Sequence, residues 1–432
     1  MTTSKQILRG TKYGMWLISE DIPINFAMIF SIRGSFTINE LQQGLDKVKR
    51  KYPSSATRVI KETDRTVYQV SDPDLKFPIR ISERQHSKSW VDEVNMELTR
   101  PFDNYTEPPV RFIWVRGDEV SEIILICNHT FVDGFSVVYV VRDLLNYLGN
   151  SDLEVEPGTY STAITELIPD FPGKRSAIWR GKIKAALLKI FIALSSKKDT
   201  QWKEMVSVAK KPYYLLPWEL TAEQTAALVE QSRANGATVH ATLCTAFLRA
   251  FGEYHKNGWS RKIQSPIDLR KRLASPVNES FDLYIQLVEF IVNCALERDF
   301  WEVAREIKQS FEHYSEDKFV FSSIVETIAL MDELFSAITP QIVAQSFTGV
   351  EYDLSISNLG RLDIPIQYGS LYLEAFYGPA LATNPEEIVL GVITIGGKMH
   401  FTMTFTDMKL TLVQAEEIKK LAMKHLADAA MW

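Results

Sequence analysis

The chain has 432 residues, of which 46% are hydrophobic, and its formal net charge is −6 at pH 7. This length exceeds that of one typical domain, and the apolar content is enough to form an ample core, so we expect two subdomains. A mildly acidic chain lacks the dominant basic surface of a general nucleic-acid binder, and we therefore expect no nucleic-acid partner.

The segment Met1–Gly14 is polar and mixed in charge, unlike a secretory signal. No run of about 18 apolar residues predicts a transmembrane helix. The three cysteines, Cys127, Cys244 and Cys294, are widely spaced in apolar surroundings, which predicts buried free thiols in a reducing compartment. Together these features predict a cytoplasmic protein.

Strand-like and helix-like segments alternate in the first part of the chain and predict an α/β fold. A helix begins after Thr37 and ends at Pro53. The predicted segments are a strand at Phe26–Ile32, a helix at Ile38–Tyr52, strands at Val110–Val115 and Ile123–Cys127, and a helix at Phe135–Leu148.

The loop between the last of these strands and the following helix reads Asn128-His129-Thr130-Phe131-Val132-Asp133-Gly134. A histidine on such a turn projects as a proton acceptor near neutral pH, although a buried structural role is the alternative. Asp133 is expected to cap the following helix or to hold an arginine, so that it shapes the loop without reacting. Gly134 allows close approach of the backbone to a substrate.

A basic segment, Phe171–Lys203, separates the two halves of the chain and departs from its acidic balance. Its only acidic residue is Asp199, and apolar residues at helical spacing predict a basic amphipathic helix. We expect either a linker helix with solvated lysines or a contact with an anionic membrane surface or an acidic carrier protein. The basic residues are Lys174, Arg175, Arg180, Lys182, Lys184, Lys189, Lys197, Lys198 and Lys203.

The second half of the chain begins near Tyr213 and repeats the pattern of helices and strands. The predicted segments are helices at Thr221–Asn235 and Thr238–Tyr254, a strand at Met399–Asp407 and a helix at Leu412–Leu426. Within this half, Ser355 and Ser357 alternate with apolar residues, which places both hydroxyls on one face of a strand. They are followed by Asn358, and a solvated strand face with a turn is the alternative to a substrate site.

The histidine loop resembles the His-His-x-x-x-Asp-Gly signature of the thioester-dependent acyltransferase superfamily. This superfamily includes chloramphenicol acetyltransferase, condensation domains of nonribosomal peptide synthetases, wax ester synthases and polyketide-associated acyltransferases. Asn128 replaces the first histidine of the signature, whereas His129, Asp133 and Gly134 match it. The segment Ser357-Asn358-Leu359-Gly360 resembles a second element of polyketide-associated and alcohol acyltransferases.

The resemblance implies two chloramphenicol acetyltransferase-like subdomains that form a V-shaped pseudo-dimer with a tunnel at their interface. We expect an N-terminal subdomain over residues 1–170, a basic amphipathic linker over 171–210 and a C-terminal subdomain over 211–432. His129 would be the general base, and an arginine at the junction, Arg58 or Arg270, would pair with Asp133. Ser355, Ser357 and Asn358 are the candidates for contact with the oxyanion or the substrate.

The implied function is transfer of an acyl group to an alcohol, in lipid or specialised metabolism. The donor would be a thioester of coenzyme A or of phosphopantetheine on an acyl or peptidyl carrier protein, and it would serve as co-substrate. The alternatives are a free-standing condensation-type amide synthase, which would use an amine acceptor, and a degenerate noncatalytic binding module.

Other kinds of chemistry do not fit the spacing of residues. Gly134-Phe135-Ser136 starts like a nucleophile elbow, but the second glycine is missing. His129 and Asp133 have no third ligand in a recognisable metal-binding array, and the sequence has no Walker loop or G-x-G-x-x-G after a strand. We therefore expect no metal and no permanently bound cofactor.

Overall fold

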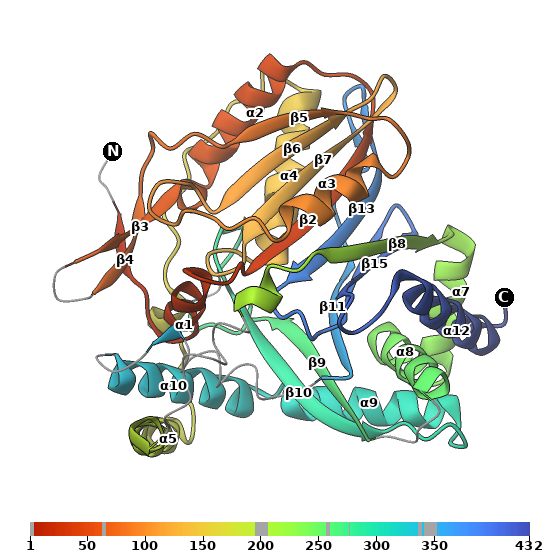
Figure 1. The fold of residues 1–432 in the computed structure, drawn as a ribbon. Coiled ribbons are helices and arrows are strands. Elements are labelled where there is room, and N and C mark those ends of the chain that lie inside the picture. The colour runs from red at the N-terminus through yellow and green to blue at the C-terminus, as the bar shows by residue number, and fades with distance from the viewer. Residues whose placement is uncertain are drawn as a thin grey trace.

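We describe the fold from a computed structural model. It describes residues 4–62, 66–194, 206–255, 260–275, 277–335, 339–340 and 352–432. In these parts the chain forms two six-stranded sheets and one three-stranded sheet, with helices on their faces (Figure 1). The predicted mixed α/β fold with two sheet-based subdomains is confirmed.

The first large sheet has the strand order β12-β13-β2-β7-β6-β5. Alternate residues of β2 enter two separate cores, because successive side chains of a strand point to opposite faces. Phe26, Met28 and Phe30 pack with helices α2 and α4, whereas Ala27 and Ile29 pack with α3. The elements are β2 (Asn25–Arg33), α2 (Ile38–Lys51), β5 (Ile79–Glu83), α3 (Ser89–Glu97), β6 (Val110–Arg116), β7 (Val120–Asn128), α4 (Gly134–Gly149), β12 (Gln367–Tyr368) and β13 (Leu371–Ala382).

The second large sheet has the strand order β10-β9-β11-β14-β15-β8. Its apolar core includes residues of helices α7, α8, α9 and α12. The elements are β8 (Tyr213–Leu220), α7 (Ala222–Ala234), α8 (Val239–His255), β9 (Ser260–Asp268), β10 (Ile285–Asn293), α9 (Phe300–Tyr314), β11 (Leu354–Arg361), β14 (Val389–Ile395), β15 (Lys398–Thr406) and α12 (Leu412–Ala430).

A three-stranded sheet of order β1-β4-β3 lies beside helix α1, and helices α5 and α10 pack against each other at the margin of the molecule (Figure 1). The elements are β1 (Lys5–Ile7), α1 (Gly10–Ser19), β3 (Thr57–Lys61), β4 (Val67–Ser71), α5 (Lys174–Leu194) and α10 (Asp317–Leu334), with single 3₁₀ turns at η1 (Pro53–Ser55) and η2 (Ile164–Glu166). None of the helices within the described ranges is long and apolar enough to cross a bilayer.

Strand β13 links the two large sheets. It pairs antiparallel with β2 in the first sheet, with Phe376 opposite Phe30, and it also packs on β14 and β15 of the second. The first sheet therefore contains strands from residues 211–432 as well as from residues 1–170. The expected division of the chain into subdomains and linker stays a prediction.

The segments predicted from periodicity correspond to elements of the structure. The helix predicted at Ile38 begins with a capping box, in which Thr37 and Glu40 satisfy each other's backbone N–H groups. Thr221 caps α7 with Gln224 in the same way. Helix α5 occupies part of the predicted basic segment, whereas Lys197, Lys198, Asp199 and Lys203 lie outside the described residues.

Candidate active site

The histidine loop joins the end of β7 to the start of α4 and is anchored to neighbouring strands. The Asn128 N–H donates to the Pro109 carbonyl at 2.9 Å, and the His129 N–H donates to the Ile24 carbonyl at 2.8 Å. Because both backbone bonds hold the loop to other segments, the position of His129 is set by the first sheet. The loop lies where the sequence predicts it.

The imidazole of His129 is held in one orientation. Its Nδ1 lies 2.9 Å from the Val132 carbonyl oxygen, and its ring centroid lies 4.8 Å from that of Phe26. A carbonyl only accepts hydrogen bonds, so Nδ1 carries the proton and Nε2 of the neutral ring keeps its lone pair. This is the tautomer that a base acting through Nε2 requires.

Burial lowers the pKa of His129 below its ordinary value, because the charged ring loses solvation. The Val132 carbonyl and the Asp133 carboxylate oppose this shift but do not overcome it. The ring is therefore neutral near pH 7 and able to accept a proton.

Asn128 is buried and stands at the position of the first histidine in the His-His-x-x-x-Asp-Gly signature. Its Nδ2 donates to Asn104 Oδ1 at 2.8 Å, and its Oδ1 accepts from the Thr130 N–H at 3.0 Å. Both ends of the amide are thus used to hold the loop. Asn128 therefore holds the loop that carries His129 in place.

Asp133 lies in a buried polar network and combines the two roles considered for it. Its Oδ1 accepts from the Ser136 N–H at 2.9 Å, which caps α4, and from Arg270 Nη2 at 2.9 Å. Its Oδ2 accepts from the Tyr284 N–H at 2.8 Å. The side chains of Asp133 and Arg270 are 0% and 2% exposed, so the carboxylate and the guanidinium neutralise each other away from water.

Arg270 is the arginine at the junction, and Arg58 is not. Arg270 Nη1 also donates to Asp268 Oδ1 at 2.8 Å. Burial acts to lower the pKa of Arg270, but Asp133 and Asp268 together raise it above its ordinary value. Arg58 lies on β3, in the small sheet, and pairs with Asp72 at 2.8 Å.

The two sequence motifs meet at Gly134. A Cβ atom at this position would lie 3.3 Å from both terminal methyl groups of Leu359 and 3.4 Å from Pro379 Cγ. Leu359 belongs to the Ser-Asn-Leu-Gly segment on β11. The absence of a side chain at Gly134 therefore lets the start of α4 approach the second motif.

The polar residues of β11 differ in their surroundings. Ser355 and Ser357 are both buried, and Ser355 Oγ donates to Gln264 Oε1 at 3.3 Å. Asn358 Oδ1 accepts from the Gly360 N–H at 2.8 Å, where Gly360 adopts φ +69°. Leu354 and Ile356, which alternate with the two serines, point to the core, as the alternation predicts. Contact of these side chains with a substrate stays a prediction.

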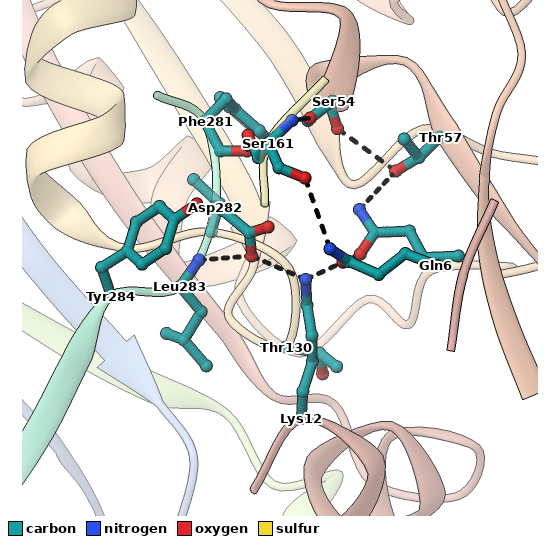
Figure 2. Close-up of polar contacts among 12 residues, drawn as sticks. Gln6, Lys12, Ser54, Thr57, Thr130, Ser161, Phe281, Asp282, Leu283 and Tyr284 are labelled. Carbon is teal, nitrogen blue, oxygen red and sulfur yellow. Dashed lines mark hydrogen bonds and ion pairs between the residues drawn. The ribbon is translucent and has the colours of Figure 1, made fainter. Parts of the chain in front are cut away.

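A second polar network, which sequence reasoning missed, lies beside the histidine loop (Figure 2). Lys12 Nζ on α1 donates to Asp282 Oδ1 at 2.6 Å and to Gln69 Oε1 at 2.7 Å. The ammonium also lies 5.8 Å from the centroid of the Phe131 ring, within the loop. No spacing signal relates Lys12 to Asp282, because 270 positions separate them in the sequence.

The backbone of Asp282 connects this network to that of Asp133. Its carbonyl accepts from Ser136 Oγ at 2.8 Å and from the Asp133 N–H at 3.3 Å. The loop of His129 is thus held on one side by α1 and on the other by the segment before β10.

A pocket opens next to Lys12 and Asp282, between α1, the segment at 163–165, β10 and α10. His129 is not one of its lining residues. Apolar and polar side chains line the pocket in equal number. The apolar residues are Ile7, Ala163, Ile164, Leu283, Ile285, Ile324 and Ile328, and the polar or charged residues are Gln6, Arg9, Thr11, Lys12, Thr165, Asp282 and Gln286. Among the described residues, no cluster of three or more His, Cys, Asp or Glu side chains forms a possible metal site.

Comparison with protein families gives one match in the second half of the chain. The model of the C-terminus of phthiocerol/phthiodiolone dimycocerosyl transferase matches residues 217–404. A curated relative, a linear gramicidin synthase of Brevibacillus parabrevis, is 24% identical over 254 residues. That match covers 54% of this chain but only 5% of the much longer synthase.

Solved structures share the fold over almost the whole chain. Polyketide synthase associated protein 5 of Mycobacterium tuberculosis is 12% identical with a TM-score of 0.65, and the match covers 99% of this chain and 100% of that protein. Trichothecene 15-O-acetyltransferase of Fusarium sporotrichioides is 12% identical with a TM-score of 0.68, and the match covers 99% and 95% of the two chains. Together with the family match, these findings confirm the resemblance to the thioester-dependent acyltransferase and condensation superfamily.

Proposed function

We propose that this chain transfers an acyl group from a thioester to an alcohol, with His129 as the general base. The observation that carries the proposal is the hydrogen bond between His129 Nδ1 and the Val132 carbonyl oxygen on a partly buried ring. It leaves Nε2 as a neutral acceptor, and the lowered pKa keeps the ring neutral at the pH where an alcohol must be activated.

We propose that the reaction has two steps. The alcohol O–H donates to His129 Nε2, and the proton moves to Nε2 as the alcohol oxygen attacks the thioester carbonyl carbon. The tetrahedral intermediate then expels the thiolate as the C–S bond breaks, and the imidazolium returns the proton to the sulfur. Asp133 and Arg270 act as positioning residues, because they hold the loop without touching the reacting atoms.

Stabilisation of the oxyanion in the intermediate needs preorganised hydrogen-bond donors. We propose that Ser357 and Asn358, with Ser355, line this part of the site. The contact between Gly134 and Leu359 supports this assignment, since it brings β11 to the loop that carries the base. The active site would then lie in a tunnel between the two sheet-based subdomains.

The donor is proposed to be coenzyme A or phosphopantetheine carried by an acyl or peptidyl carrier protein, bound as a co-substrate. The family match to an acyl transferase and the fold shared with an O-acetyltransferase support ester formation. The relative that is a peptide synthase supports the second candidate, a condensation-type amide synthase with an amine acceptor.

An acceptor screen tests both candidates. Purified protein is incubated with acyl-CoA or acyl-carrier-protein thioesters and a panel of alcohols and amines, and released thiol and product mass are measured. We expect ester formation that falls by about 10²–10⁴-fold in His129→Ala. Amide products with the same dependence would favour the amide synthase. Binding of thioesters without turnover by any acceptor would favour a noncatalytic module.

A further inference from the structure

Helix α5 packs on α10 through small residues at four-residue spacing. Ala177 and Ala185 are 0% and 1% exposed, and Gly181 lies between them on the same face. A Cβ atom at Gly181 would lie 2.4 Å from the Glu326 carbonyl oxygen on α10. The two helices therefore approach more closely than larger side chains would allow.

The opposite face of α5 is apolar and exposed. Trp179, Leu187 and Ile190 are 65%, 61% and 58% exposed, and Ile183 adds to the same row. Their spacing of four, four and three residues places them along one side of the helix. We call Trp179, Ile183, Leu187 and Ile190 the outer stripe. Figure 1 shows α5 at the margin of the molecule, outside α10.

A helix that is apolar on two opposite faces normally has both faces covered. Here α10 covers one face, whereas the outer stripe is a row of large exposed side chains of the kind that marks a contact site. Scattered single apolar residues are ordinary on a protein surface, but four in register on one helix are not.

The charges of α5 suit an anionic partner. The helix carries six basic residues and no acidic one. Four of these residues form ion pairs: Arg180 and Lys184 with Glu326 and Lys182 with Glu333 of α10, and Lys174 with Asp170. Arg175 and Lys189 form no ion pair with any described residue. Since Arg175, Lys182 and Lys189 are seven residues apart, they lie along one edge of the outer stripe.

We propose that the outer stripe is a membrane-surface contact, in which α5 lies in the plane of an anionic bilayer. Trp179, Ile183, Leu187 and Ile190 enter the boundary between head groups and acyl chains, and Arg175 and Lys189 of the edge bind lipid phosphates. A tryptophan at this boundary keeps its indole N–H in contact with head groups.

The geometry favours a membrane over an acidic carrier protein. The stripe runs from Trp179 to Ile190, about 17 Å along the convex surface of the helix, and a bilayer surface accommodates such a face along its whole length. A carrier protein would need a complementary groove of the same length. The proposal does not depend on the reaction that the chain catalyses.

Vesicle flotation with the whole chain tests the proposal. We expect the wild type to float with vesicles of phosphatidylcholine and phosphatidylglycerol at low ionic strength, and less at high salt. Arg175→Glu with Lys189→Glu should lower partitioning by roughly tenfold or more. Trp179→Gln with Leu187→Gln and Ile190→Gln should lower it by roughly a hundredfold.

Two controls separate the stripe from general effects. Leu412→Gln with Val413→Gln makes the same chemical change at residues that are 52% and 70% exposed on α12, and should bind vesicles like the wild type. Trp179→Phe keeps an apolar side chain, so binding should persist. Quenching of tryptophan fluorescence by lipids with brominated acyl chains should nevertheless fall in this variant.

Several results would overturn the proposal. The first is that the wild type does not bind anionic vesicles at low salt. The second is that the variant with glutamine at positions 179, 187 and 190 binds vesicles as well as the wild type does. The third is that this variant loses self-association of the protein and keeps its binding to vesicles. The chain could instead bind an acidic acyl carrier protein and not vesicles, with binding weakened by Arg175→Glu and Lys189→Glu. This result would assign the outer stripe to a protein partner. Transfer from a short, water-soluble thioester should be unchanged in all variants, which keeps this test separate from that of His129.

Discussion

Arg270 and Asp133 are joined by a hydrogen-bonded ion pair of 2.9 Å, although 137 positions separate them and neither side chain is more than 2% exposed. Arg270 follows β9 of the second sheet, whereas Asp133 precedes α4 on the first. The pair therefore connects the two sheets directly behind the loop that carries His129. A buried pair of this kind is costly to break from one side, because the remaining charge is left without a partner.

Asp133→Ala should strongly destabilise the protein. Loss of the α4 cap lowers the free energy of unfolding by about 1 kcal/mol, and leaving Arg270 buried without Asp133 lowers it by roughly 3–5 kcal/mol. For the second effect we expect the lower end of the range, because Asp268 still pairs with Arg270. Denaturant unfolding followed by circular dichroism gives the change. Arg58→Ala, which breaks a half-exposed pair with Asp72, should cost at most about 1 kcal/mol.

The double variant Asp133→Ala with Arg270→Met should recover part of the loss, because no buried charge remains. An Asp133→Ala variant as stable as the wild type would show that the pair does not hold the two sheets together.

His129→Ala should lower the rate of acyl transfer by about 10²–10⁴-fold, which is the usual contribution of a general base. The fold should persist, because the hydrogen bond that the ring forms with Val132 lies within the loop itself. Turnover is measured by released thiol at saturating donor. His313→Ala removes an exposed histidine and should leave the rate unchanged. A well-folded His129→Ala enzyme with a normal rate would exclude the proposed base.

The pH dependence should show a neutral base with a depressed pKa. Burial lowers the pKa of His129 from its ordinary 6.5, so activity is complete above the folded-state pKa and is lost as the pH falls through it. We expect the acidic limb of kcat/KM to have its midpoint below 6.5. In Asp133→Asn the midpoint should move to still lower pH, because the carboxylate raises the pKa. An acidic limb at or above the ordinary histidine pKa would contradict this assignment.

Gly134→Ala should affect the rate more than the stability. The new methyl group meets Leu359, and this neighbour is only partly buried and can shift by a few tenths of an ångström. The gain in helix propensity, up to about 1 kcal/mol, offsets the crowding. Displacement of Leu359 moves the chain next to Ser357 and Asn358, so we expect a rate loss of roughly tenfold.

Combining Gly134→Ala with Leu359→Ala should restore much of this rate, since the smaller side chain leaves room for the methyl group. The test is a double-mutant cycle, in which turnover and melting temperature are measured for both single variants and for the double variant. A rate loss that the second change does not relieve would show that crowding at Leu359 is not its cause.

Local signals explain what the sequence predicts well. Thr37 and Thr221 start helices because their side chains satisfy the first backbone N–H groups, and these signals need no tertiary context. The loop around His129 is predictable in the same way, because an apolar strand precedes it and a helix follows. The choice between Arg58 and Arg270 was not predictable, since it depends on how two sheets pack.

The remaining features depend on contacts between distant segments. Strand β13 joins the first sheet from the far end of the chain, and no periodicity within it indicates the neighbour. Helix α5 is apolar on two faces, so its pattern alone does not show which face α10 covers. Lys12 resembles any surface lysine until the fold places it beside Asp282.

Lys12→Met should destabilise the protein and slow the reaction. Lys12 and Asp282 are 12% and 4% exposed, and removal of the ammonium leaves a buried carboxylate, at a cost of roughly 3 kcal/mol. The Leu283 N–H still donates to Asp282 Oδ1, which limits the loss. Because the Asp282 carbonyl holds Ser136 and Asp133, a shift of this segment should also reach the loop of His129.

A matched variant distinguishes this effect from the loss of any lysine. Lys398→Met breaks a half-exposed pair with Glu219 and should change stability by at most about 1 kcal/mol, with a normal rate. Adding Asp282→Asn to Lys12→Met removes the unpaired charge and should recover stability and part of the rate. If the single variant has wild-type stability and turnover, the network around Lys12 does not support the histidine loop.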